Sequence, residues 1–251
     1  MNIQISTLSE RPDFSDALWD LRAQVPAFMG QDPVADLYFM DAEEVHRDYV
    51  LVAWEDSAPN RLIARGFSVP FTRDGGEPVD FLPDDGWDGI IRRAYGDRKS
   101  GRKPDAVSAL EITVDRGYRG RGVSVAMVEA MRANARSRGF TDLFAPVRPN
   151  AKHEVPLMSM QEYLRVKTSE GFPADPWLRV HCRLGARMVK TAPRSMTVTG
   201  TCAEWRQWTG LPFDRTGPVV VPEALVPVHC FHEQDWAVYV EPNVWVHHML
   251  Q

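Results

Sequence analysis

Apolar and polar positions alternate with two different periods along the chain, and the changes between them mark the predicted elements. Two-residue alternation and short β-branched runs predict strands at residues 2–8, 49–54, 62–71 and 106–114. Spacing of three and four residues predicts helices at 14–23, at 35–47 and from about residue 122 onward. Beyond residue 185 the pattern predicts closing strands at 187–191 and 196–199 and a short helix at 203–208. Strands and helices interleave, which is typical of a mixed α/β fold.

Three stretches interrupt or extend this regular pattern. Residues 72–105 are rich in Gly, Pro and charge and predict a flexible insertion, and a second insertion covers residues 151–177. Residues 201–251 are dense in Val, Pro and Trp, too apolar to remain free of the core. We therefore expect a domain at 1–200 with both insertions, and a C-terminal extension at 201–251 packed on it. The extension walls a substrate site or forms the contact of a homodimer; the sequence leaves both open.

Composition narrows the class of protein. The 251 residues are 44% hydrophobic, which suffices for a substantial core, and the net charge of −5 argues against nucleic-acid binding. The first residues alternate like a strand and lack the pattern of a leader, and no apolar run is long enough for a membrane span, so we expect a cytoplasmic protein. The sequence contains three widely spaced cysteines, which do not predict a disulfide framework. Its histidines have no cluster of carboxylates nearby, so we expect no metal site.

A glycine-rich basic turn, Arg119-Gly120-Arg121-Gly122-Val123-Ser124, joins the strand at 106–114 to the next helix. The first amides of a helix lack intrahelical acceptors and lie at the positive end of its dipole, so they bind anions with several oxygens. Gly120 and Gly122 let a phosphate approach the backbone, and Arg119 and Arg121 add positive charge. The spacing excludes the nucleoside-triphosphate loop and the dinucleotide fingerprint. The turn predicts a diphosphate site, with a solvated turn as the alternative.

The spacing of this turn resembles the signature of the GCN5-related N-acetyltransferases: Gln or Arg, two residues, Gly, one residue, then Gly or Ala. Ser124 takes the last place as another small residue. The resemblance implies a mixed, mostly antiparallel central sheet flanked by helices, here with a β-rich C-terminal extension. It also implies that residues 119–124 hold the diphosphate of acetyl-CoA, the co-substrate, and that the backbone of Ile112, Thr113 and Val114 binds the pantetheine arm. Asn150 resembles the family asparagine that contacts coenzyme A.

Residues 178–186 resemble the family's second signature, a short helix that ends in Leu-Gly. The resemblance places His181 where most members carry a tyrosine that protonates the departing thiolate, and an imidazolium is a competent acid near neutral pH. Transfer to an amine also requires a base. Glu111 lies in an apolar run, where partial burial brings a carboxyl group toward the working range of a base, and is the candidate. An outward-facing, solvated Glu111 and the rival base His153 are the alternatives.

Basic residues outnumber acidic ones by eight to four between residues 148 and 190. Most of this stretch belongs to the second insertion, which the resemblance places on the acceptor side. We therefore hypothesise an acceptor amine that carries a carboxylate, bound by Arg148, Lys152 and Arg165. A solvated charged face without a ligand is the alternative.

These observations together predict an N-acetyltransferase that transfers the acetyl group directly from acetyl-CoA to the amine of a small metabolite. Two other classes of function remain open at this point. One is a non-catalytic module that binds acyl-CoA, since the usual tyrosine is missing. The other is an interaction protein whose functional surface is the Trp-rich tail.

Overall fold

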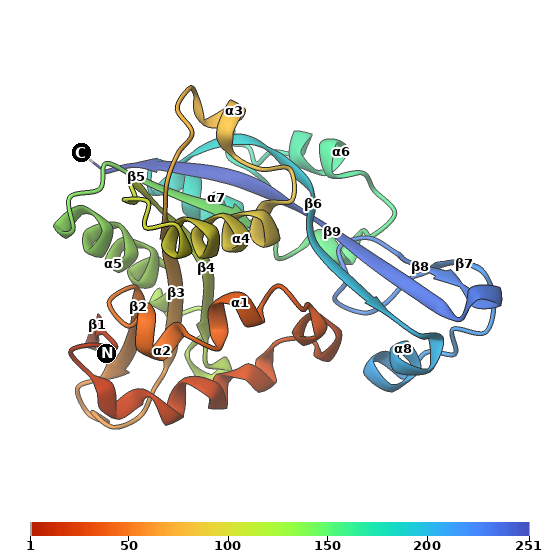
Figure 1. Ribbon diagram of the computed structural model, residues 1–251, viewed down its shortest axis with the longest axis horizontal. Coiled ribbons are helices and arrows are strands. Elements are labelled where there is room, and N and C mark those ends of the chain that lie inside the picture. The colour runs from red at the N-terminus through yellow and green to blue at the C-terminus, as the bar shows by residue number, and fades with distance from the viewer. Residues whose placement is uncertain (1, 251) are drawn as a thin grey trace.

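The computed structural model describes residues 2–250, except for the side chains at positions 22–24 and 79. Figure 1 shows one long, twisted sheet with helices on both faces. Its nine strands are β1 (Ile3–Thr7), β2 (Val50–Glu55), β3 (Ala64–Phe71), β4 (Ala106–Val114), β5 (Asp142–Val147), β6 (Arg187–Gly200), β7 (Gly217–Val219), β8 (Val228–Phe231) and β9 (Trp236–Met249). Their order is β1-β2-β3-β4-β5-β9-β8-β7, and β6 pairs with β9. The expected mixed α/β fold with a mostly antiparallel sheet is confirmed, since β4 and β5 are its one parallel pair among the described residues.

Helices cover both faces of the sheet. The α-helices are α1 (Asp36–Phe39), α2 (Ala42–Val45), α3 (Pro78–Phe81), α4 (Gly86–Lys99), α5 (Val123–Ser137), α6 (Met160–Arg165), α7 (Pro176–Arg183) and α8 (Cys202–Thr209). The 3-10 helices are η1 (Pro12–Phe14), η2 (Asp16–Gln24), η3 (Ala27–Gln31), η4 (Arg116–Tyr118), η5 (Lys152–Glu154) and η6 (His232–Gln234). The two helices expected at 14–23 and 35–47 are therefore short, and partly of the tighter 3-10 form. Between residues 2 and 250, no helix has the length and apolar character needed to cross a membrane.

The last strand, β9, lies inside the sheet. The sequence placed residues 236–249 in an extension packed on the core; in the structure, this segment pairs with β5 along residues 244–249 and with β6 along almost its whole length. Figure 1 shows β6 and β9 as two long ribbons that run from the main body into a smaller lobe. That lobe contains α8, β7 and β8, and its core includes Trp205, Phe213 and Tyr239. The chain thus leaves the sheet after β6 and returns to it with β9.

The segment at 72–105 contains an ordered helix, so the expectation of a flexible insertion is wrong. Helix α4 buries Trp87, Ile90, Ile91 and Ala94 against the face of the sheet that also carries η2 and α1. These four positions follow helical spacing of three and four residues. The surrounding Gly, Pro and charged residues obscured that short period in the sequence. On the opposite face, α5 packs through Val123, Met127 and Met131.

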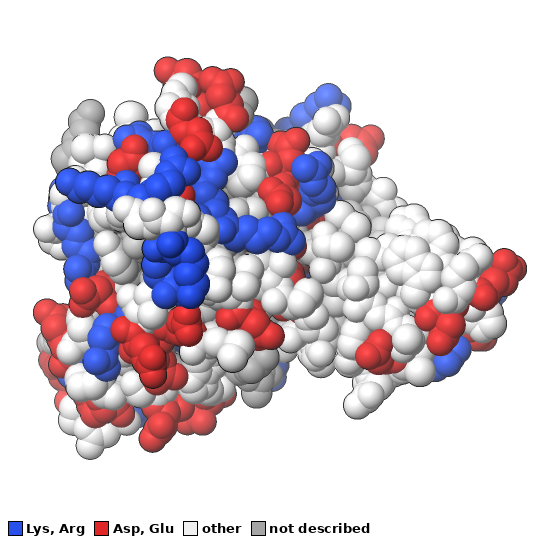
Figure 2. All heavy atoms as spheres, in the orientation of Figure 1, with Lys and Arg blue, Asp and Glu red and all other residues white. Residues whose placement is uncertain are grey.

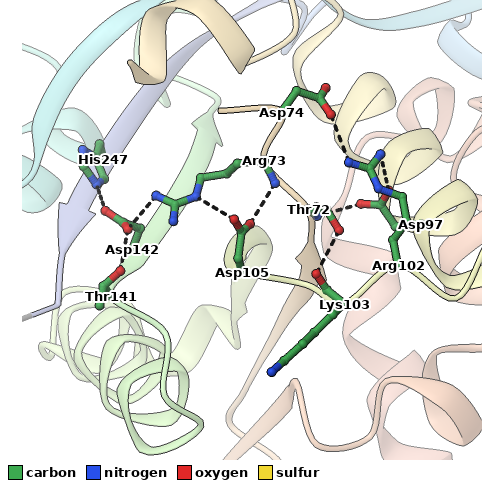
Figure 3. A network of polar contacts seen from close by, with 10 residues as sticks. All are labelled: Thr72, Arg73, Asp74, Asp97, Arg102, Lys103, Asp105, Thr141, Asp142 and His247. Atoms are coloured by element: carbon green, nitrogen blue, oxygen red, sulfur yellow. Dashed lines mark hydrogen bonds and ion pairs between the residues drawn. The ribbon is translucent and has the colours of Figure 1, made fainter. Parts of the chain in front are cut away.

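Parallel strands β4 and β5 touch at one end only. Their pairing consists of Val107 with Leu143 and Ser108 with Phe144, and beyond these residues the two strands diverge. At the joined end, Arg73 bridges the two strand starts: its Nη1 lies 3.0 Å from Asp142 Oδ2 and its Nε lies 3.4 Å from Asp105 Oδ2 (Figure 3). Arg73 therefore fixes the closed end of a splay whose open end lies at the glycine-rich turn.

Candidate active site

The glycine-rich turn has the shape that an anion site at a helix start requires. Gly120 and Gly122 adopt φ values of +74° and +82°, and α5 begins at the next residue, Val123. Both glycines are exposed, and a Cβ built on either would meet no other atom within 4 Å. The backbone that leads into α5 is therefore uncovered, beside the exposed side chains of Arg119 and Arg121, and the first amides of the helix lack intrahelical acceptors. The residues present fit a bound diphosphate.

The edge of β4 that faces the splay is open along its second half. On its other edge, β4 pairs with β3 as far as Val114, which lies opposite Ala64. The pairing of β4 with β5 ends at Ser108. The register with β3 also shifts, because Phe67 pairs with Glu111 and Ser68 pairs with Ala109, which leaves Leu110 as a β-bulge. Ile112, Thr113 and Val114 lie beyond the bulge, on the open edge. A ligand with amide groups can therefore pair with β4 in place of the missing strand.

Glu111 points to the face of the sheet opposite α5, where it meets Arg65 of β3. Arg65 Nε donates to Glu111 Oε1 over 2.9 Å, and Thr113 Oγ1 donates to the same oxygen over 2.6 Å. The Arg65 side chain is 3% exposed and that of Glu111 is 23% exposed. Arg65 also donates to the carbonyl of Leu18 in η2. Glu111 is thus a partly accessible carboxylate with a buried cationic partner, rather than a solvated residue on an outer face.

His181 lies in the last turn of α7 and is almost fully buried. Its Nδ1 lies 2.9 Å from Nε2 of His248 in β9, and Trp177 packs edge-on against its ring. Burial, with a further contribution from His248, lowers the pKa of His181 to about 3. The neutral ring therefore predominates near neutral pH, which differs from the imidazolium expected from the sequence. Its Nε2 is buried and makes no hydrogen bond to any described residue, so a neutral N–H at this atom has a hydrogen bond to donate, although not a proton, since losing it would leave an imidazolate.

The three cations expected to bind an acceptor carboxylate are not brought together. Arg148 Nε donates to Glu241 Oε2 over 2.9 Å, and Glu241 is fully buried. Lys152 is also fully buried, and its Nζ donates to the carbonyls of Val155 and Leu225. Arg165 is exposed on α6. Arg148 and Lys152 therefore hold the second insertion and the loop before β8 onto the sheet. Their buried N–H groups require hydrogen-bond acceptors, and these segments provide them.

Two further residues from the sequence lie near the end of β5. Asn150 is exposed in the turn after that strand. His153 lies in η5, with its Nε2 3.9 Å from Glu223 Oε1. Neither is joined to Glu111 or His181 by any hydrogen bond between described residues.

Basic side chains gather on one face over α4 (Figure 2). The arginines of α4 and the following turn pair with aspartates: Arg92 with Asp85, Arg93 with Asp74, Arg98 with Asp41 and Arg102 with Asp97. Lys103 lines a surface hollow with Ser137, Gly139 and Phe140, at the C-terminal end of α5. A helix of this length spans about 22 Å, so this basic turn lies far from the glycine-rich turn at the other end.

Three residues that shape the site escaped the sequence analysis. Arg65 is a charge within an apolar strand, the same signal that pointed to Glu111, and it was available for the same inference. His248 was considered only as a metal ligand; in the structure it is the partner of His181. Trp87 donates its indole N–H to the carbonyl of Leu110 over 3.1 Å, and no sequence pattern connects these positions.

The chain was compared with known proteins. No family model matches it. The arginine N-acetyltransferase avaD of Aspergillus versicolor is 32% identical over 273 residues, an alignment that covers 97% of this chain and 93% of avaD. Among solved structures, the loading GNATL domain of CurA from Lyngbya majuscula matches 100% of this chain and 98% of its own with a TM-score of 0.57 and 12% identity. The GphF GNAT-like decarboxylase in complex with isobutyryl-CoA matches 100% of both chains with a TM-score of 0.54 and 15% identity. The two structures support the fold alone.

Proposed function

The chain belongs to the GCN5-related N-acetyltransferase superfamily, and from this premise we propose that it acetylates the α-amine of a small carboxylate-bearing acceptor, with arginine as the leading candidate. The observation that carries the proposal is the open glycine-rich turn at the start of α5, beside the splay of β4 and β5. The relative of 32% identity supports arginine as the acceptor, because the alignment covers nearly all of both chains.

The residues present support a coenzyme A thioester as donor. The amides at the start of α5, with Gly120 and Gly122, would hold the diphosphate, and Arg119 and Arg121 would add charge. The open edge of β4 at Ile112, Thr113 and Val114 would pair with the amide groups of the pantetheine arm. The thioester then lies in the splay, where a backbone amide near Val114 polarises its carbonyl.

Glu111 is the proposed base on the acceptor side. Both of its described hydrogen bonds end on Oε1, so Oε2 is left to receive the proton of the acceptor ammonium, directly or through a water molecule. Arg65 holds the carboxylate in place from behind. The α-amine of arginine is the group that attacks, because the guanidinium group stays protonated at any physiological pH and is not a nucleophile.

His181 is the proposed residue that stabilises the departing sulfur. Its Nε2 is the nitrogen that faces away from His248, and a neutral imidazole with its hydrogen there donates a hydrogen bond to the thiolate. The proton that the sulfur takes is the one that the attacking nitrogen loses as the amide forms, because a neutral imidazole that gave up its own proton would become an imidazolate. For the acceptor carboxylate, Arg165 is the one of the three predicted cations whose side chain is exposed.

Thiol release from acetyl-CoA, measured with a panel of amines, tests the proposal. The panel contains arginine, agmatine, which lacks the carboxylate, and citrulline, which lacks the positive charge. We expect the highest kcat/KM with arginine, at least tenfold above both analogues, and a product heavier by one acetyl group on the α-nitrogen. Binding of acetyl-CoA without turnover of any amine would instead indicate a non-catalytic module.

A further inference from the structure

The bulge in β4 lies at the point where that strand loses its neighbour. Leu110 has no partner on β3, because the register steps from Ala109 to Glu111. It has none on β5 either, since that pairing ends at Ser108. Leu110 is therefore the residue of the site whose backbone neither adjacent strand fixes.

Trp87 supplies the missing constraint. Its indole Nε1 donates to the Leu110 carbonyl over 3.1 Å, from the first turn of α4. Trp87 is 8% exposed and stacks on Phe39, with 6.1 Å between ring centroids. A carbonyl in such surroundings is unfavourable without a donor, so the bond ties the bulge to the position of the indole.

Trp87 is itself anchored to the far side of the splay. Its backbone N–H donates to Ser195 Oγ over 2.8 Å, and Ser195 Oγ donates to Asn243 Oδ1 over 2.6 Å. Gly86 permits this close approach, because a Cβ there would lie 2.2 Å from Ser195 Oγ. Trp87 thus connects β6, through its backbone, to the bulge of β4, through its side chain.

We propose that Trp87 is a positioning residue for the acyl donor: its indole fixes the β4 bulge so that the strand edge beyond it holds the thioester for attack. This inference rests on the proposed donor site along β4 and adds to it a residue from outside the two family signatures. Trp87 makes no contact with the glycine-rich turn that any described interaction records, so it acts on the acyl end of the donor and leaves the diphosphate end unchanged.

Trp87→Phe tests the inference, because it keeps an aromatic ring and removes the N–H. The matched control is Trp205→Phe: the Trp205 Nε1 donates to the Ala237 carbonyl over 3.0 Å in the smaller lobe, and Trp205 is 0% exposed against 8% for Trp87. Calorimetric titration with free coenzyme A and with acetyl-CoA gives two dissociation constants for each variant, and kcat and the thermal midpoint are measured alongside them.

We expect Trp87→Phe to bind free coenzyme A within twofold of the parent, to lose about tenfold in kcat, and to lose the difference in affinity between acetyl-CoA and coenzyme A. Trp205→Phe keeps all three values within twofold, even where its thermal midpoint falls. If Trp87→Phe does not fold, Ser195→Ala, which removes the hydroxyl that links the Trp87 backbone N–H to Asn243, is expected to lower kcat two- to fivefold.

Unchanged kcat and unchanged acetyl-CoA affinity in Trp87→Phe would overturn the inference. Equal losses in Trp87→Phe and Trp205→Phe, in step with their thermal midpoints, would also overturn it, since that outcome indicates a structural role. Failure of the proposed function looks different: the parent protein would then acetylate no amine, while the two affinities would still report on Trp87.

Discussion

Glu111 and Arg65 differ in exposure, and that difference determines what each can do. Arg65 is enclosed between Glu111, the Leu18 carbonyl and the rings of Trp19 and Phe67. Glu111 remains 23% exposed on its other side. A buried guanidinium cannot exchange protons, whereas a carboxylate with one accessible oxygen can. The pair therefore has a structural member and a reactive member.

Glu111→Gln separates these two roles at the residue scale. The glutamine oxygen still accepts from Arg65, but the side chain no longer takes a proton from the acceptor. General bases contribute about 100-fold or more to a rate, so we expect kcat to fall by about that factor. The dissociation constant for coenzyme A stays within twofold. Thr113→Val is the control, because it removes one hydrogen bond to Oε1 and keeps the carboxylate; a loss equal to that of Glu111→Gln would contradict the base role.

The sequence predicts that replacing Arg148 weakens binding of the acceptor, whereas the structure predicts that it lowers stability. Arg148→Gln leaves the fully buried Glu241 without its cationic partner, an effect of about 3–5 kcal/mol in broken buried pairs. We expect a large fall in the thermal midpoint and an unchanged KM for the acceptor in the protein that remains folded. Arg165→Gln, the same change at an exposed position, leaves stability unchanged and raises the acceptor KM about tenfold if Arg165 binds the carboxylate. Equal stability of the two variants would refute the structural assignment of Arg148.

At the scale of elements, the two ends of α5 provide an internal comparison. Gly122 precedes the helix at φ +82°, and Gly139 follows it at φ +85°; in both places a side chain would meet no atom within 4 Å. Valine is equally strained at either position. Gly122→Val would also fill the space expected to hold a phosphate. We therefore expect similar thermal midpoints for Gly122→Val and Gly139→Val, but an affinity for coenzyme A at least tenfold weaker in Gly122→Val alone. Equal affinities of the two variants for coenzyme A would show that this turn does not bind the diphosphate.

Elements that form by local rules were predictable, and elements defined by distant partners were not. The strand at 106–114 and the helix after Gly122 carry their own periodicity and were located from it. Helix α4 carries the same period, hidden among glycines and charges. Strand β9 was recognisable as extended, but its place between β5 and β6 depends on partners 37 to 60 residues away in β6 and 97 to 107 residues away in β5. The turn of the site was therefore visible in the sequence, whereas the pairings Glu111–Arg65 and His181–His248 were not.

At the scale of the whole molecule, burial shifts the pKa values of several titratable groups. Burial, with a contribution from a nearby arginine, lowers the pKa of His46 to about 4 and that of His248 to about 4. The pKa of His181 is lowered in the same way, to about 3. In the opposite sense, burial and the charge of Asp32 raise the pKa of Asp88, where η3 meets α4. In the folded protein His46, His181 and His248 are thus neutral, and Asp88 is protonated, near neutral pH.

These groups predict an optimum of stability near pH 6.5. An unfolded histidine binds a proton below its pKa of about 6.5, and the folded ones do not until about pH 4, so unfolding takes up protons in this window and stability falls as the pH falls. Each histidine contributes a slope of about 1.4 kcal/mol per pH unit. Asp88 has the opposite sign: it holds its proton in the folded state and loses it on unfolding, so its contribution falls as the pH rises. Above pH 6.5 the histidine contribution is constant, and the free energy of unfolding falls because of Asp88, whose carboxyl group is paired with that of Asp32.

Urea unfolding between pH 4.5 and 8.5 measures the slope on each side of the optimum. His46→Gln is expected to lower the slope on the acid side by about one proton and to leave the slope on the alkaline side unchanged. A free energy of unfolding that falls from pH 4.5 to 6.5, which is the direction of the Asp88 contribution alone, would show that these histidines are protonated in the folded protein.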